Sequence, residues 1–180
     1  MVGLSFPVPQ AHNLLLDVNL AMGFPAGRFL EDEVNEVSAP MVAKDRGIEV
    51  KEQSSNEKTS FATLVRIVVT GSDGRQARVA GTLGSDKAPR IVCWGDFEMD
   101  ALLEGTILVL QNEDRPGVIG TVGTILGESK INVARMQVAL DSKSRKAVQL
   151  WSLDSNLGEN VLNLVRSAKD VQNATAVIVS

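Results

Sequence analysis

The segment over residues 112–132, NEDRPGVIGTVGTILGESKIN, constrains the fold more than any other part of this 180-residue chain. It follows the apolar run TILVLQ, which is typical of a buried strand, and Val118, Val122 and Ile125 then recur at helical spacing on one stripe. Pro116 suits the start of a helix, where an amide hydrogen has no partner, and Asp114 is expected to cap that helix. The segment therefore predicts a strand, a turn and a helix in direct succession.

The pattern continues to the C-terminus after a domain boundary at Gly105. The sequence predicts strands over 106–111, 131–140, 147–154 and 171–180, and helices over 117–130 and 158–169. In the second of these strands, Ala134, Met136, Val138 and Leu140 are expected on one face. The order β-α-β-β-α-β is that of ferredoxin-like folds, so residues 105–180 are expected to form one such domain.

Residues 31–104 predict a smaller domain built on an antiparallel sheet, which makes the whole chain α+β. The runs FATLVRIVVT and QARVAGTL favour strands, and Asp73-Gly74 between them is a tight-turn signal. Two further short strands are expected on either side of Gly95-Asp96.

The beginning of the chain gives weaker signals. Pro40 interrupts a helix expected over 30–46, and an alternating strand is expected over 48–53. Residues 1–30 contain several prolines and glycines without a clear period, so we interpret them as a leader or a truncated segment.

Three glycines lie on one side of the helix expected after the turn. Gly120, Gly123 and Gly127 follow each other at spacings of three and four residues. A glycine inside a helix costs about 1 kcal/mol relative to alanine, so some contact must compensate. We expect a close approach of the helix to a sheet or to a second subunit.

The turn itself is a candidate binding site for a carboxylate. The amides of Gly117, Val118 and Ile119 are expected at the helix N-terminus, where free N–H groups and the helix dipole attract anions. A dinucleotide site fits less well, because the spacing from Gly117 is G-x-x-G-x-x-G rather than G-x-G-x-x-G, and no P-loop is present.

Composition excludes several classes of function. A net charge of −4 and an aromatic content of 4% disfavour nucleic-acid binding. One cysteine, Cys93, and one histidine, His12, are too few for a zinc site, and His12 has no sequence context of a catalytic triad. No apolar run reaches membrane-spanning length. The chain is expected to be cytoplasmic, without a metal, a nucleic-acid partner or a membrane partner, and without a catalytic site of its own.

The residues also carry a family resemblance. DRPGVIGTVGTILGESKINVARM resembles the first half of an ACT domain and, more narrowly, the C-terminal domain of the D-3-phosphoglycerate dehydrogenases, the family of the first enzyme of serine biosynthesis. Upstream, EVNEVSAPMVAKDRGIEVKE, FATLVRIVVTGSDGRQARVAGTL and RIVCWGDFEMDALLEG resemble the same family's intervening domain, also called the allosteric substrate-binding (ASB) domain. The resemblance covers residues 31–180 and implies an ASB-like domain over 31–104 and an ACT domain over 105–180.

The resemblance implies a regulatory function. In this family an effector amino acid, L-serine where the domain responds, binds between two ACT domains, and the matching positions here are Asn112, Asp114 and Asn132. Asn112 is shorter than the family's usual histidine, tyrosine or arginine. The implied partners are L-serine and a second copy of the chain. NAD would belong to the family's catalytic domains, to which nothing in this sequence corresponds.

Other interpretations stay open at this stage. The ASB-type region of some relatives binds anions, for which Arg66, Arg78, Lys87 and Arg90 are the candidates. Iron–sulfur L-serine dehydratases also combine ASB-like and ACT regions, but their PSSSHT-type motif and cluster cysteines are missing here. A dimerisation scaffold that senses nothing is the third alternative, and capping or turn formation alone could explain Asp114 and Asn132.

Overall fold

A computed structural model describes residues 47, 49, 60, 61, 63–71, 73–141 and 144–179. The expected leader over 1–30 and the interrupted helix over 30–46 lie outside the described residues, as does the expected strand over 48–53 apart from Glu49.

The first domain contains an antiparallel sheet of four strands in the order β1-β2-β3-β4. Its strands are β1 (Val65–Thr70), β2 (Gln76–Leu83), β3 (Pro89–Trp94) and β4 (Phe97–Leu102). The predicted turn between β1 and β2 is confirmed: Gly74 has a φ of 79°, and the Asp73 carboxylate accepts the Arg75 backbone N–H at 3.0 Å. The two strands predicted around Gly95-Asp96 are β3 and β4.

The second domain has the predicted β-α-β-β-α-β order. Its elements are β5 (Gly105–Glu113), α3 (Val118–Glu128), β6 (Val133–Asp141), β7 (Lys146–Leu153), α4 (Glu159–Arg166) and β8 (Val171–Val179). The strands pair antiparallel in the order β6-β7-β5-β8, so β6 and β8 form the two edges. The predicted α+β fold, a small antiparallel sheet followed by a ferredoxin-like domain, is thereby confirmed.

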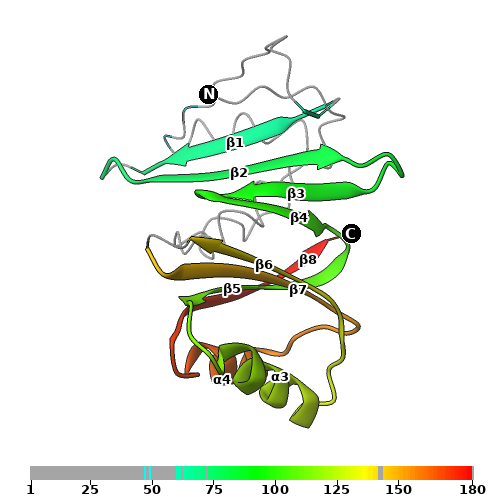
Figure 1. The fold of residues 1–180 in the computed structure, drawn as a ribbon, viewed down its shortest axis with the longest axis vertical. Helices are drawn as coiled ribbons and strands as arrows, with labels where there is room; N and C mark the ends of the chain where they lie inside the picture. The colour runs from blue at the N-terminus through cyan, green and yellow to red at the C-terminus, as the bar shows by residue number, and fades with distance from the viewer. Residues whose placement is uncertain are drawn as a thin grey trace.

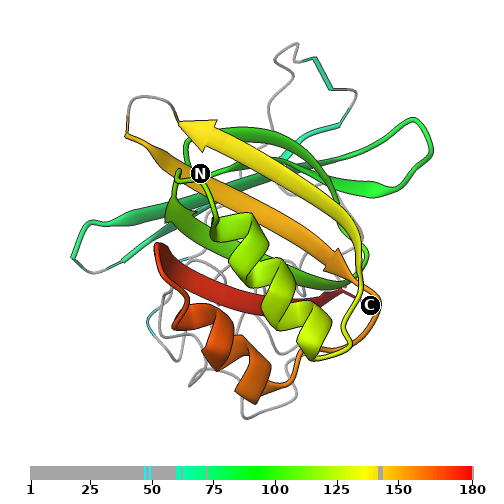
Figure 2. The ribbon, with the colours of Figure 1, turned by 60° about the horizontal axis from the view of Figure 1, so that its bottom comes forward.

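The two sheets and the helices form three layers (Figures 1 and 2). Successive side chains of β5 point to opposite faces of its sheet, so the strand contributes apolar residues to a core on each face. Leu108 and Leu110 face α3 and α4 in one core, whereas Ile107 and Val109 face the first sheet in a second core. The second sheet is therefore buried on both faces, and the two domains share an apolar interface. Among the described residues, no helix has the length and hydropathy needed to cross a bilayer.

Strand β6 departs from the predicted alternation. Its register with β7 shifts between Val133 and Arg135, so one extra residue, Ala134, lies in a bulge. Met136 pairs with Trp151, whose side chain belongs to the core under the helices. Met136, Val138 and Leu140 thus share the helix-facing side as predicted, whereas Ala134 lies in the bulge, where the period of two is interrupted.

The glycines of α3 do not pack against the sheet. A Cβ atom added at Gly120, Gly123 or Gly127 would meet no atom within 4 Å. The sheet-facing stripe of α3 is instead formed by Val118, Val122 and Leu126. Of the two expected contacts, the approach to a sheet is therefore wrong, and the approach to a second subunit stays a prediction.

Candidate functional site

The N-terminus of α3 forms an open, uncapped helix end. Gly117 is the N-cap with a φ of 101°, and no side chain caps the helix. The expected capping by Asp114 is therefore wrong, because Asp114 lies three residues before the N-cap. Pro116 also precedes the N-cap instead of opening the helix. The first amides of α3, beginning at Val118, consequently have no partner within the helix and carry the positive end of its dipole.

Asp114 is held by its backbone and not by its side chain. Its N–H donates to the Arg145 carbonyl at 2.9 Å, and the Glu113 N–H donates to the Asp170 carbonyl at 3.0 Å. Arg115 beside it forms an ion pair with Glu113 at 2.7 Å. The Asp114 side chain is exposed and forms no hydrogen bond or ion pair with another described residue. A fixed backbone with a free carboxylate suits an acceptor for an ammonium group.

Asn112 does not lie at the surface with Asp114. It is 2% exposed and points into the core between the sheet and the helices. Its Oδ1 accepts a hydrogen bond from Gln149 Nε2 at 2.8 Å, and its Nδ2 donates to the Glu113 carbonyl at 2.7 Å. A ligand could contact the Asn112 side chain only if that side chain first moved out of the core.

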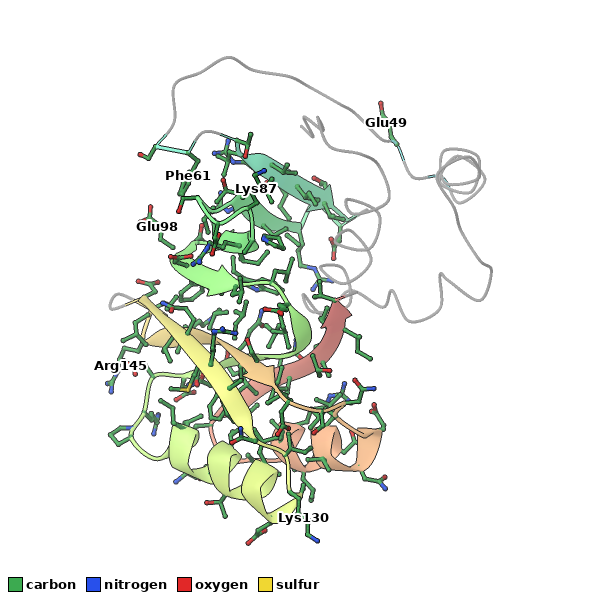
Figure 3. All side chains as sticks on the ribbon, turned by 90° about the vertical axis from the view of Figure 1, so that its right-hand side faces the viewer. Glu49, Phe61, Lys87, Glu98, Lys130 and Arg145 are labelled. Carbon is green, nitrogen blue, oxygen red and sulfur yellow. The ribbon has the colours of Figure 1, made fainter. Side chains whose placement is uncertain are left out.

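Asn132 lies at the opposite end of the domain. It precedes β6, and its backbone bonds to Asp154 twice, since its N–H donates to Oδ1 and its carbonyl accepts the Asp154 N–H, both at 3.1 Å. The 11 residues of α3 separate it from Asp114 by about 16 Å along the helix axis. Figure 3 shows the two ends, with Arg145 at the end that contains Asp114 and Lys130 near Asn132. One chain therefore does not bring the two predicted effector residues together.

A cavity of about 640 Å³ lies between the two sheets. Its charged lining consists of Asp86, Arg90, Asp100, Glu104 and Arg135. Arg90 is engaged by Asp100 at 3.0 Å and Asp86 at 3.2 Å. These two carboxylates raise the pKa of Arg90, and the Ala88 backbone N–H together with Arg90 lowers the pKa of Asp86. Carboxylates outnumber guanidinium groups here, so the lining does not form a strongly basic anion site.

The other candidates for anion binding lie elsewhere. Arg66 and Arg78 are exposed on the side of the first sheet that faces away from the second, because Ile67 and Val79 next to them face the shared core. Arg78 forms an ion pair with Asp96. Lys87 is exposed in the loop between β2 and β3 (Figure 3). Of the four predicted residues, Arg90 alone lines the cavity.

Sequence reasoning did not single out Arg135, an exposed cation that lines the cavity. The alternation of side chains along β6 could have placed Arg135 on the face of the sheet opposite to that of Met136. No local sequence pattern, however, indicated that the first sheet covers that face. Among the described residues, no three histidine, cysteine or acidic side chains cluster as metal ligands would.

Comparisons with known proteins identify both domains. Residues 20–94 match the D-3-phosphoglycerate dehydrogenase intervening domain, and residues 106–149 match the ACT domain. The D-3-phosphoglycerate dehydrogenase of Bacillus subtilis is 34% identical over 152 residues, covering 84% of this chain and 29% of that protein. Those of Mycobacterium tuberculosis (30% over 152 residues, 84% of this chain and 29% of that protein) and Methanocaldococcus jannaschii (30% over 144 residues, 80% and 27%) are also similar.

The strand order β6-β7-β5-β8 and the helices on one face, with the ACT match, define an ACT-domain protein. The intervening domain before it narrows the class: the chain belongs to the D-3-phosphoglycerate dehydrogenase family and corresponds to the family's regulatory ACT region with its intervening domain. The chain spans 29% of the length of the first relatives named above.

Proposed function

We propose that this chain is an effector-sensing module that binds a small amino acid, L-serine, between the ACT domains of two copies. The observation that carries the proposal is the separation of Asp114 and Asn132 at the two ends of α3. A site that uses both residues needs a second chain. A two-fold axis that places two α3 helices antiparallel brings Asp114 of one copy to Asn132 of the other, and it creates two equivalent sites.

The surface around β6 supports such an interface. Among the described strands, β6 lies at an edge of its sheet, and an edge strand can pair with a second β6. Large apolar side chains stay exposed beside this edge: Ile119 is 44% exposed, Met136 42% and Leu140 59%. The open glycine face of α3, the helix on the β6 side of the sheet in Figure 2, allows a second helix to approach closely. The opposite edge also exposes Ile178 and Leu164, but its helix α4 lacks a glycine face.

The chemistry of the proposed site fits a zwitterion. The uncapped N-terminus of α3 receives the α-carboxylate, and Asp114 accepts hydrogen bonds from the α-ammonium group. Asn132 of the second copy bonds to the remaining polar groups, which for serine include the hydroxyl. Binding would bridge two subunits and favour one arrangement of them over another, which is the basis of allosteric control.

The activity that such a module would control belongs to the longer relatives. We propose that it regulates an NAD-dependent phosphoglycerate dehydrogenase in L-serine synthesis, with the NAD site on catalytic domains outside this sequence. A dimerisation scaffold that binds no effector is the alternative, and the inward position of Asn112 is the observation that favours it.

Isothermal titration with L-serine, with glycine and L-alanine for comparison, tests the proposal. We expect saturable serine binding that is lost in Asp114→Ala and in Asn132→Ala and retained in two controls on exposed residues remote from the site, Glu98→Ala and Asn160→Ala. No binding at millimolar serine by a folded, dimeric wild type would establish the scaffold alternative.

A mixing experiment then tests the shared site. Each site takes Asp114 from one copy and Asn132 from the other, so a heterodimer of the two inactive variants contains one intact site. After subunit exchange, an equal mixture should recover roughly a quarter of the wild-type sites, as random pairing requires. Recovery of none would mean that both residues act in the same chain.

A further inference from the structure

Three polar side chains form a continuous hydrogen-bonded chain in the core under α3 and α4. Trp151, Gln149 and Asn112 are each 2% exposed. Trp151 Nε1 donates to Gln149 Oε1 at 3.0 Å, Gln149 Nε2 donates to Asn112 Oδ1 at 2.8 Å, and Asn112 Nδ2 donates to the Glu113 carbonyl at 2.7 Å. We call these three residues the amide relay. Its bonds offset the unfavourable burial of the polar groups.

The hydrogen bonds of the amide relay run from donor to acceptor in one direction, which Trp151 determines. An indole nitrogen can donate a hydrogen bond but cannot accept one. Gln149 must therefore turn its oxygen toward Trp151 and its NH₂ group toward Asn112. Asn112 must in turn offer its oxygen to Gln149 and its NH₂ group to Glu113. The orientation of both amides thus follows from one side chain of β7, the indole of Trp151.

The relay ends on the peptide unit from which the β5–α3 turn departs. Glu113 is the last residue of β5, and α3 begins at Val118. The N–H of Glu113 is held by Asp170 and that of Asp114 by Arg145, so the Asn112 bond to the Glu113 carbonyl completes the fixation of this unit. The four residues after Glu113 lead directly to the amides at the start of α3.

We propose that Trp151, Gln149 and Asn112 are positioning residues, which orient the β5–α3 turn so that the α3 amides and Asp114 meet the effector. In this arrangement Asn112 acts through the Glu113 carbonyl and not as a direct ligand. The inference rests on the proposed function, because it assigns a task to core residues beneath the same site. It also explains how Asn112 can matter for binding while it is buried.

The first test combines titration with NMR. Gln149→Met removes the central amide at similar volume, and Trp151→Phe removes the N–H while keeping an aromatic ring. Leu150→Ala is the control. Leu150 lies on the other face of β7 in the shared core, so its truncation destabilises the fold without removing any hydrogen bond of the relay. We expect both relay variants to bind serine about tenfold more weakly, the effect of one lost hydrogen bond. The amide resonances of residues 114, 115 and 117–119 should shift in both, and Leu150→Ala should change neither property.

Gln149→Glu adds a pH profile that a purely structural role would not produce. A protonated carboxyl can donate to Asn112 Oδ1, but a carboxylate cannot, so serine affinity in this variant should fall as the pH rises from 5.5 to 8.5. Wild-type affinity should stay flat over the same interval.

The outcomes separate the two proposals. A wild type that binds no serine overturns the proposed function and this inference together. A wild type that binds serine, with Gln149→Met and Trp151→Phe within about twofold of it, overturns the relay alone. Unchanged amide resonances of the β5–α3 turn in a folded Trp151→Phe variant would also overturn the relay, and this measurement needs no ligand.

Discussion

At the residue scale, the charged groups at the cavity show how neighbours decide what a side chain can do. Arg90 was a candidate for anion binding, yet Asp86 and Asp100 both engage its guanidinium group. Asp86 also accepts the Ala88 backbone N–H at 3.0 Å, which is the larger cause of its lowered pKa. The carboxylates of Asp86 and Asp100 thus compete with any incoming anion for the same guanidinium group.

We predict that Arg90→Gln raises the pKa of Asp86 but leaves it below its ordinary value of 3.8, because the Ala88 N–H still stabilises the carboxylate. A lowered pKa stabilises the fold above the unfolded value, and this contribution is lost as the pH falls through the folded value. Carboxyl-carbon NMR titration measures the change. Asp73, whose pKa is lowered by Arg75, is the internal control and should not move. An Asp86 pKa that does not respond would show that Arg90 contributes nothing to it.

At the element scale, α3 combines an apolar stripe with an open glycine face. The stripe of Val118, Val122 and Leu126 explains how the helix is retained despite three glycines. Nothing in the described part of the chain explains the glycines themselves, because added Cβ atoms would enter free space. A partner helix that packs against this face in the proposed dimer would account for them.

We predict opposite effects of Gly123→Ala on the subunit and on the dimer. Better helix propensity should stabilise the isolated subunit by about 0.5–1 kcal/mol, since the new methyl group meets no atom. The same methyl group should weaken self-association by blocking the close approach of a second α3. Urea unfolding at low concentration measures the first effect, and sedimentation equilibrium measures the second.

Thr121→Ala is the matched control, because Thr121 is exposed and two residues along a helix point in nearly opposite directions. It should improve helix propensity without changing self-association. Unaltered association in Gly123→Ala would exclude α3 from the interface.

At the scale of the whole molecule, the two domains share a core. Ile67, Val79 and Ile91 from the first sheet pack with Ile107 and Leu150 from the second. Neither sheet alone could shield the apolar side chains of this face from water, so each sheet stabilises the other. A rearrangement of one sheet would consequently change the packing of the other, which suits the proposed transmission of an effector signal.

We predict that the described domains unfold in a single cooperative transition. The two tryptophans provide one probe per sheet, since Trp94 lies in β3 and Trp151 in β7. Fluorine NMR of protein containing 5-fluorotryptophan should show both signals changing at the same denaturant concentration. Ile91→Ala should lower the free energy of unfolding by about 2–5 kcal/mol and shift both signals equally. Separate midpoints would mean that the shared core couples the domains weakly.

The sequence by itself determined the local elements and the family. Apolar runs predicted β5, β7 and β8, the Asp73-Gly74 pair predicted a hairpin, and the helical spacing of apolar residues after Gly117 predicted α3. These features depend on neighbours within a few residues, so a local pattern encodes them. The segment after β5 likewise indicated the helix end that forms one half of the candidate site.

The tertiary structure alone decided how these parts meet. The first sheet covers β5 and β6, and that packing places Arg135 at a cavity. The register of β7 on β5 brings Gln149 beneath Asn112 and turns that side chain inward. The length of α3 separates Asp114 from Asn132. The Gln149–Asn112 contact joins residues 37 positions apart. The free energy of such contacts depends on burial and register, for which no local pattern contains the information.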